Sequence, residues 1–144
     1  MILLSWDLTD WKALARPVSI TALRTALAER FPGAIIPLKD VRYCSIPWSA
    51  LSEMQDYIMS SQRRGKTPAY SADDWDCDDQ AEDRIAAIRR WWAQKKLGLG
   101  ALAVGVVDVL SLTGNLHELC WLYDYMPTPR IVAFEGATGK QASL

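Results

Sequence analysis

The stretch Asp76-Cys-Asp-Asp-Gln-Ala-Glu-Asp-Arg-Ile-Ala-Ala-Ile-Arg-Arg-Trp-Trp92 decides the fold, because it carries the clearest helical pattern in the sequence. Its apolar residues recur at intervals of four, three and four and share one face of a helix: Ala81, Ile85, Ile88 and Trp92. We expect this helix to begin at residues 76–79 and to end at residues 96–98. Trp91 cannot share the apolar face with Trp92, so we expect it to be exposed.

Two further helices are predicted before this one. The first follows the N-cap residue Ser19 and stops at Phe31-Pro-Gly33. The second starts at Pro47, and its predicted core stripe consists of Leu51, Met54, Tyr57 and Ile58. Residues 1–17 show no regular pattern, and we expect Trp6 and Trp11 to pack on a surface. The polar stretch 63–76 reads as a loop within one domain.

After Gly98 and Gly100 the pattern changes to strands. Residues 101–110 are rich in β-branched side chains, and strands over 116–123 and 130–135 follow, each after a turn. Helices followed by a strand meander predict an α+β fold, with the helix that begins near Cys77 packed on a C-terminal antiparallel sheet. Because 144 residues make one ordinary core, we expect a single domain over 1–144.

Composition narrows the classes of partner and compartment. A formal net charge of −1 gives no electrostatic reason to expect nucleic acid or an anionic membrane as a partner. Three widely spaced cysteines indicate neither a disulfide framework nor a zinc ribbon, so a reducing compartment is favoured. We see no signal peptide and no apolar run near the roughly 20 residues of a membrane span, so we expect a cytoplasmic protein. Homo-oligomer formation stays open.

Three residues could form a nucleophilic site. Cys77 heads a helix, where the macrodipole favours a thiolate. His117 is the only histidine of the chain and begins a predicted strand. If Tyr123 pairs with Ile131 or Arg130, antiparallel counting brings His117 opposite about Gly136, one residue from Glu135. We expect Glu118, the neighbour of His117, to be solvated on the other strand face.

A nucleophilic cysteine needs a base and a group that orients the base, and Cys77, His117 and Glu135 supply these three residue types. The acidic run around Cys77 opposes this chemistry, because like charge raises the pKa of a thiol. Residues 73–83 carry seven carboxylates. Protonated His117 or a bound divalent cation could compensate, and carboxylates suit Ca²⁺, Mn²⁺ or Mg²⁺. The EF-hand loop pattern is not matched, and a solvated acidic loop is the alternative to a metal site.

The segment Trp75-Asp-Cys-Asp-Asp-Gln-Ala81, followed by His117 and then by Phe134-Glu-Gly-Ala-Thr-Gly139, resembles a known family. It is similar to the papain-like cysteine protease domain at the C-terminus of the Marasmius oreades agglutinin, which has small relatives in bacteria and phages. The resemblance implies a papain-like fold with Cys77 as nucleophile, His117 as base and Glu135 as orienting group. It also implies that Asp78 and Asp79 help to hold calcium.

Two functions are therefore expected as alternatives. The first is a cysteine hydrolase of the thiol protease type that acts on a peptide or protein substrate, with a calcium-assisted active-site loop. The second is a catalytically inactive papain-like module with a structural or interaction role, of phage origin and associated with a virion or its machinery.

Overall fold

The computed structural model describes residues 10–62, 76–110 and 114–142, so that Trp6, Asp73, Asp74 and most of the 63–76 stretch lie outside the described residues. The elements are α1 (Trp11–Leu14), β1 (Arg16–Val18), α2 (Ile20–Arg30), β2 (Tyr43–Ser45), α3 (Trp48–Gln62), α4 (Cys77–Gln94), β3 (Ala101–Leu102), β4 (Val104–Leu110), β5 (Leu116–Asp124) and β6 (Arg130–Phe134). The predicted α+β class is confirmed.

The predicted C-terminal meander is present as the antiparallel sheet β4-β5-β6. The predicted strand over 101–110 is divided at Ala103. The part before this residue pairs in parallel with β2 in a second small sheet, β1-β2-β3. Ala103 itself donates a backbone hydrogen bond to Cys44 at 2.8 Å and accepts one from Tyr123 at 3.0 Å, so it links the two sheets.

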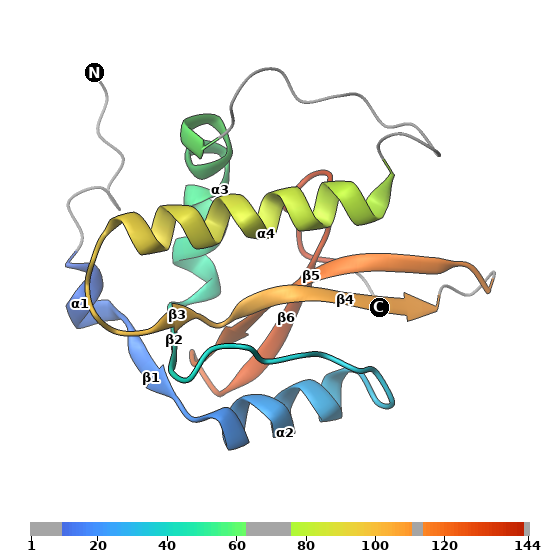
Figure 1. The fold of residues 1–144 in the computed structure, drawn as a ribbon, viewed down its shortest axis with the longest axis horizontal. Coiled ribbons are helices and arrows are strands. Elements are labelled where there is room, and N and C mark those ends of the chain that lie inside the picture. The colour runs from blue at the N-terminus through green and yellow to red at the C-terminus, as the bar shows by residue number, and fades with distance from the viewer. Residues whose placement is uncertain (1–9, 63–75, 111–113, 143–144) are drawn as a thin grey trace.

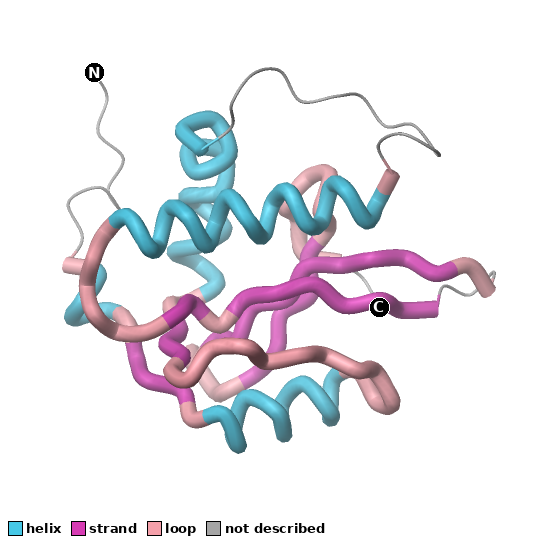
Figure 2. Tube along the Cα trace, viewed as in Figure 1, coloured by secondary structure: helices cyan, strands magenta, loops and turns pink. Residues whose placement is uncertain are grey.

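The meander lies between helices (Figures 1 and 2). One hydrophobic cluster joins α3 and α4 to one face of the sheet through Val104, Cys120, Leu122 and Phe134. A second cluster joins α2 to the other face through Val107, Leu119, Trp121, Tyr123, Ile131 and Ala133. The central strand β5 is therefore buried on both faces, which explains its nearly continuous run of apolar residues.

Helix α4 begins at Cys77, within the predicted limits, and its predicted apolar stripe is buried. The prediction for Trp91 is wrong, because its side chain is 5% exposed. Its ring packs edge-on against Trp11, with the ring centroids 5.2 Å apart. A tryptophan beside the main stripe is buried here because a second element, α1, covers that side of the helix.

The N-terminal prediction is also wrong for the described residues. Residues 11–18 form α1 and β1, and Trp11 is buried in the core rather than lying on the surface. Asp10 caps α1 by accepting from the backbone N–H of Ala13 at 3.2 Å, and β1 pairs with β2. These elements are too short to show a period in the sequence, and they are stabilised by neighbours distant in the chain.

Helices α2 and α3 follow their predictions closely. Ser19 caps α2, with its hydroxyl oxygen accepting from the backbone N–H of Ala22 at 3.0 Å. In α3, Met54 and Ile58 are buried as predicted, but Tyr57 is exposed and does not belong to the core. Among the described residues, no helix is long and apolar enough to cross a membrane. The single domain and the cytoplasmic location stay predictions.

Candidate functional site

Cys77, His117 and Glu135 line one cleft at the N-terminal end of α4. The cleft has a volume of about 260 Å³ and is lined by Cys77, Gln80, Leu116, His117, Glu118, Glu135, Gly136 and Ala137. The three residues come from the start of α4, the start of β5 and the residue after β6. The fold therefore brings together the three residues singled out in the sequence.

His117 and Glu135 form a direct pair. The imidazole Nε2 lies 3.0 Å from the Glu135 carboxylate, and both side chains are partly exposed. Tyr123 pairs with Ile131, as predicted, and β6 ends at Phe134. The chain then turns, because the backbone N–H of Gly139 donates to the carbonyl of Glu135 at 2.8 Å. An acceptor at Nε2 favours the tautomer that leaves Nδ1 free to accept a proton.

The Cys77 sulfur lies next to a hydrogen-bond acceptor. Its Sγ is 3.6 Å from the Oδ1 of Asp78, which accepts a hydrogen bond from the thiol. Burial raises the pKa of Cys77, and the carboxylates of Asp78 and Asp76 raise it further, whereas a backbone hydrogen bond with Glu118 lowers it. The local charge thus opposes the helix macrodipole and favours the neutral thiol over the thiolate.

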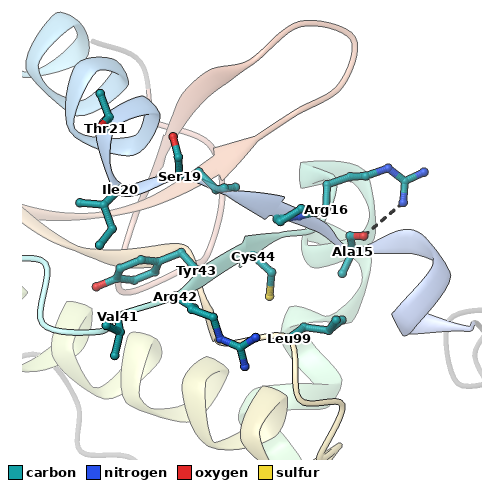
Figure 3. Close-up of a pocket in the computed structure, with 12 residues that line it drawn as sticks. Ala15, Arg16, Ser19, Ile20, Thr21, Val41, Arg42, Tyr43, Cys44 and Leu99 are labelled. Atoms are coloured by element: carbon teal, nitrogen blue, oxygen red, sulfur yellow. Dashed lines mark hydrogen bonds between the residues drawn. The ribbon is translucent and has the colours of Figure 1, made fainter.

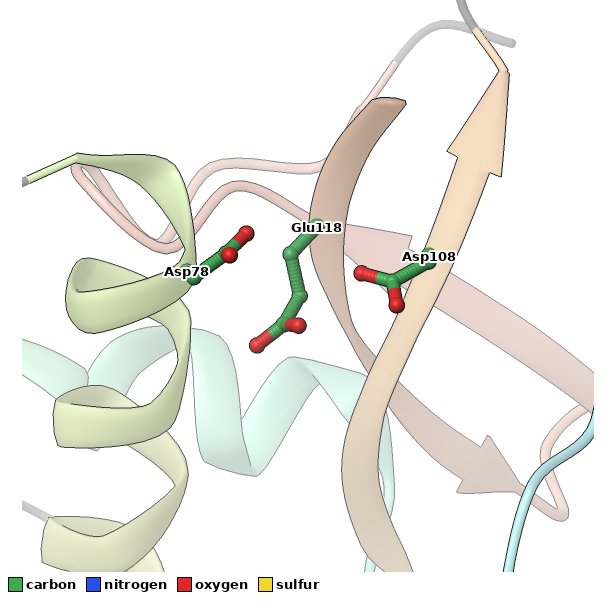
Figure 4. Close-up of side chains that lie close together, drawn as sticks. All are labelled: Asp78, Asp108 and Glu118. Atoms are coloured by element: carbon green, nitrogen blue, oxygen red, sulfur yellow. The ribbon is translucent and has the colours of Figure 1, made fainter. Parts of the chain in front are cut away.

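Three carboxylates converge beside this cleft, between α4 and the sheet (Figure 4). Asp78, Asp108 and Glu118 each place one oxygen within 4.8 Å of the others. Asp108 and Glu118 are register partners on β4 and β5, which brings their Cβ atoms to about 5 Å from each other. Three ionised carboxylates this close repel one another, so a proton or a cation between them would lower the electrostatic free energy.

Glu118 is the buried member of this cluster. It is 7% exposed, and its Oε1 has no hydrogen-bond partner among the described residues. Burial raises the pKa of Glu118 to about 8, and the neighbouring carboxylates of Asp108, Glu82 and Asp78 raise it as well. The expectation of a solvated Glu118 is wrong, because α4 covers the face of β5 on which this side chain lies.

The two predicted metal ligands have different surroundings. Asp78 belongs to the carboxylate cluster, whereas Asp79 accepts from the backbone N–H of Asp76 at 3.3 Å and closes the capping box of α4. An oxygen-ligand site can be built from Asp78, Asp108 and Glu118, and the unpartnered buried Oε1 of Glu118 fits a cation. Asp108 was not predicted as a ligand from the sequence. The feature that could have pointed to it is a single acidic residue within the apolar strand β4.

A larger cavity lies elsewhere, between the β1-β2 pair and the start of α2 (Figure 3). Its volume is about 670 Å³, and its walls are mainly apolar. Arg16 turns toward the carbonyls of Ala13 and Ala15, and Arg42 donates to the carbonyl of Gly98 at 3.0 Å. Both guanidinium groups thus already form hydrogen bonds with the backbone. The described lining of this cavity includes the Cys44 thiol but no histidine and no carboxylate.

No protein-family model and no curated protein matches the sequence. Solved structures with a similar fold include the Polyporus squamosus lectin PSL1a in complex with E64, at a TM-score of 0.65 and 19% identity. This match covers 90% of the chain and 46% of PSL1a. A Polyporus squamosus lectin bound to the human-type influenza-binding epitope Neu5Acα2-6Galβ1-4GlcNAc matches at a TM-score of 0.65 and 20% identity, over 90% of the chain and 45% of the lectin.

These comparisons identify the fold, which the chain shares with about half the length of each lectin. They correct the expectation of a hydrolase of the thiol protease type that uses calcium and is of phage origin. The proteins that share the fold are described as lectins, one of them with a bound glycan epitope, and they support neither a protease nor calcium nor a phage. Of the two expected functions, the interaction module is the better supported.

Proposed function

We propose that this chain is an interaction module that binds a partner in the cleft between α4 and the β5-β6 end of the meander. The observation that carries the proposal is the charge around Cys77, whose Sγ lies 3.6 Å from the Asp78 carboxylate, because a neighbouring negative charge disfavours a thiolate. The same cleft presents an imidazole, a carboxylate and the Gln80 amide. These groups can donate to and accept from a polar ligand without any covalent step.

The partner class is proposed from two sources. A carbohydrate is favoured as the partner because the proteins with a similar fold are described as lectins, one of them with a bound glycan epitope. The carboxylate of Glu135 and the amide of Gln80 can form hydrogen bonds with sugar hydroxyl groups. The resemblance of the sequence to a papain-like cysteine protease domain favours an extended peptide as the partner. Nucleic acid is disfavoured, because the described residues that line the cleft include two glutamates and no lysine or arginine.

Binding to a glycan array and to a peptide library tests the proposal. We expect binding that Glu135→Ala weakens at least about tenfold, since loss of a charged hydrogen bond costs about 1.5–3 kcal/mol. The matched control is Asp56→Asn, which removes a carboxylate from the exposed surface of α3. Equal binding by Glu135→Ala and wild type, or no binding to either library, would contradict a binding role for the cleft.

A second candidate is favoured by one specific observation, the 3.0 Å pair between His117 and Glu135. In this candidate Cys77 gives its proton to His117, its sulfur bonds to a carbonyl carbon, and the imidazolium protonates the leaving group as the old bond breaks. Glu135 would orient the imidazole. Catalytic contacts often tighten only when substrate binds, so the contact between Cys77 and Asp78 does not exclude this chemistry.

Alkylation of the three cysteines separates the two candidates. Cys44 and Cys120 are buried, with pKa values raised to about 11 and about 12, so they serve as slow internal references. For the interaction module we expect Cys77 to react with iodoacetamide at pH 7 more slowly than free cysteine, and His117→Ala to leave the rate within about twofold. Fast alkylation by iodoacetamide or E64 that His117→Ala slows tenfold or more would instead show that His117 activates Cys77 and would favour the acyl-transfer candidate.

We also propose that Asp78, Asp108 and Glu118 hold a divalent cation. A bound cation would supply positive charge that offsets Asp78 beside the Cys77 thiol. We expect Ca²⁺ or Mn²⁺ to raise the thermal unfolding midpoint, because a ligand that binds the folded state stabilises it. Asp108→Asn should abolish the increase, whereas Asp56→Asn should retain it. Identical midpoints with cation and with chelator would refute the site.

A further inference from the structure

We infer that Arg84 and Gln55 form a buried clamp that positions Glu135 against the helix carrying Cys77. This inference deepens the proposed function, because it names the residues that give the cleft its shape. Arg84 acts through the backbone of the 135–140 turn, so it is a positioning residue.

The clamp consists of hydrogen bonds to the turn that follows Glu135. Arg84 donates from Nε to the carbonyl of Gly136 at 2.7 Å and from Nη2 to the carbonyl of Ala137 at 3.2 Å. Its Nη1 donates to the Oε1 of Gln55 at 2.9 Å, and the Nε2 of Gln55 donates to the carbonyl of Gly139 at 2.7 Å. Two side chains from two helices therefore hold three carbonyls of one short turn.

The clamp is deep in the molecule. Arg84 is 4% exposed and Gln55 is 3% exposed. A buried guanidinium is strongly destabilising unless its donors are satisfied, and here they meet backbone carbonyls and an amide oxygen. Truncating either side chain would leave buried carbonyls without donors, so the turn would have to move to regain hydrogen bonds.

The helix connects the clamp to the thiol. Arg84 follows Cys77 by seven residues and Ala81 by three, so the three residues lie on one side of α4. Gly136 packs directly on this side, because a Cβ at Gly136 would lie 2.5 Å from the Ala81 nitrogen. One rigid helix thus carries Cys77 and holds the turn next to Glu135, which sets the position of the carboxylate relative to the thiol.

Arginine is required by the geometry of the contacts. A guanidinium offers several donors in a fixed planar fork, whereas a lysine ammonium is a compact group on a flexible stem. Lysine at position 84 would keep the charge but could not reach Gly136, Ala137 and Gln55 with the same directions. Arg84→Lys is therefore expected to leave the fold intact and to release the turn.

The single histidine makes the test direct, because each imidazole NMR signal comes from His117. We expect Arg84→Lys to move these signals toward the positions seen in Glu135→Ala, in which the carboxylate partner is removed. The matched control is Arg89→Lys on the same helix, whose arginine donates to the carbonyl of Val104 at 2.9 Å, and its His117 signals should not move.

A second variant, Gln55→Asn, shortens the other arm of the clamp and should produce a smaller shift in the same direction. Unchanged His117 signals in a folded Arg84→Lys or Gln55→Asn protein would overturn the inference. The readout needs no ligand, so it is independent of partner binding. Wild-type protein that binds no partner, with His117 signals that respond to Arg84→Lys, would refute the proposed function and leave the clamp standing.

Discussion

Replacing Glu118 by glutamine should raise the free energy of unfolding of the metal-free protein at pH 8 by roughly 1–3 kcal/mol, because a buried carboxylate without a compensating charge is replaced by a neutral amide. In the folded protein the pKa of Glu118 is raised from 4.5 to about 8 by burial and by neighbouring carboxylates. The folded state therefore binds a proton more tightly than the unfolded state does. Stability is greatest below pH 4.5 for this group and falls as the pH rises toward 8.

Glutamine removes this dependence, because it stays neutral and its amide can donate to Asp108 as the protonated carboxyl would. Denaturant unfolding between pH 4 and pH 9 measures the effect. The wild type should lose stability across this range more steeply than Glu118→Gln, with the two proteins most similar at acidic pH. Glu82→Gln, which removes a more distant and exposed charge, is the control and should change the slope less. Parallel pH profiles of the free energy of unfolding for wild type and Glu118→Gln would show that ionisation of Glu118 does not destabilise the folded protein.

Replacing Gly136 by alanine should destabilise the protein by about 2 kcal/mol and displace the turn that follows Glu135. The added Cβ would lie 2.5 Å from the nitrogen and 2.6 Å from the Cα of Ala81. Both atoms belong to the backbone of α4, so neither can rotate away. The turn must shift, and we expect the pair between His117 and Glu135 to open.

Chemical denaturation and the His117 NMR signals measure the two parts of this prediction. The control is Gly33→Ala, where the added Cβ would meet no atom within 4 Å beyond the adjoining residues of the chain, but the backbone has a φ of +79°. This substitution should cost roughly 1 kcal/mol through backbone strain and leave the His117 signals in place. If Gly136→Ala matches Gly33→Ala in both measurements, the close approach between the turn and α4 is not what shapes the cleft.

The helix that carries Cys77 and the pairing of β5 with β6 could be predicted because both are local in the chain. Helical spacing specifies one face of α4, and the short turn between Asp124 and Arg130 sets the strand register. From these two features the neighbourhood of His117 and Glu135 follows by counting. The acidic surroundings of Cys77 were equally visible, since Asp76 and Asp78 adjoin it.

The elements that pack on each face of β5 and α4 could not be predicted from the sequence. The spacing of β5 shows that Glu118 lies on the opposite face from His117, but only the packing of α4 on that face makes Glu118 buried. Trp91 likewise lies beside the stripe of α4 and is covered by Trp11, which comes from a short N-terminal element. The division of the 101–110 strand at Ala103 depends on hydrogen bonds to β2, more than fifty residues earlier in the chain.

By itself the sequence determined the helix that begins at Cys77, the meander, and the three residues that meet in the cleft. Periodicity and turn length are encoded by neighbouring residues, so they can be predicted without knowledge of the rest of the chain. The tertiary structure alone decided which carboxylates gather beside the thiol and that Arg84 and Gln55 hold the turn after Glu135. Those contacts join α3, α4 and the sheet, and their energies depend on burial and distance, which appear only when the elements pack.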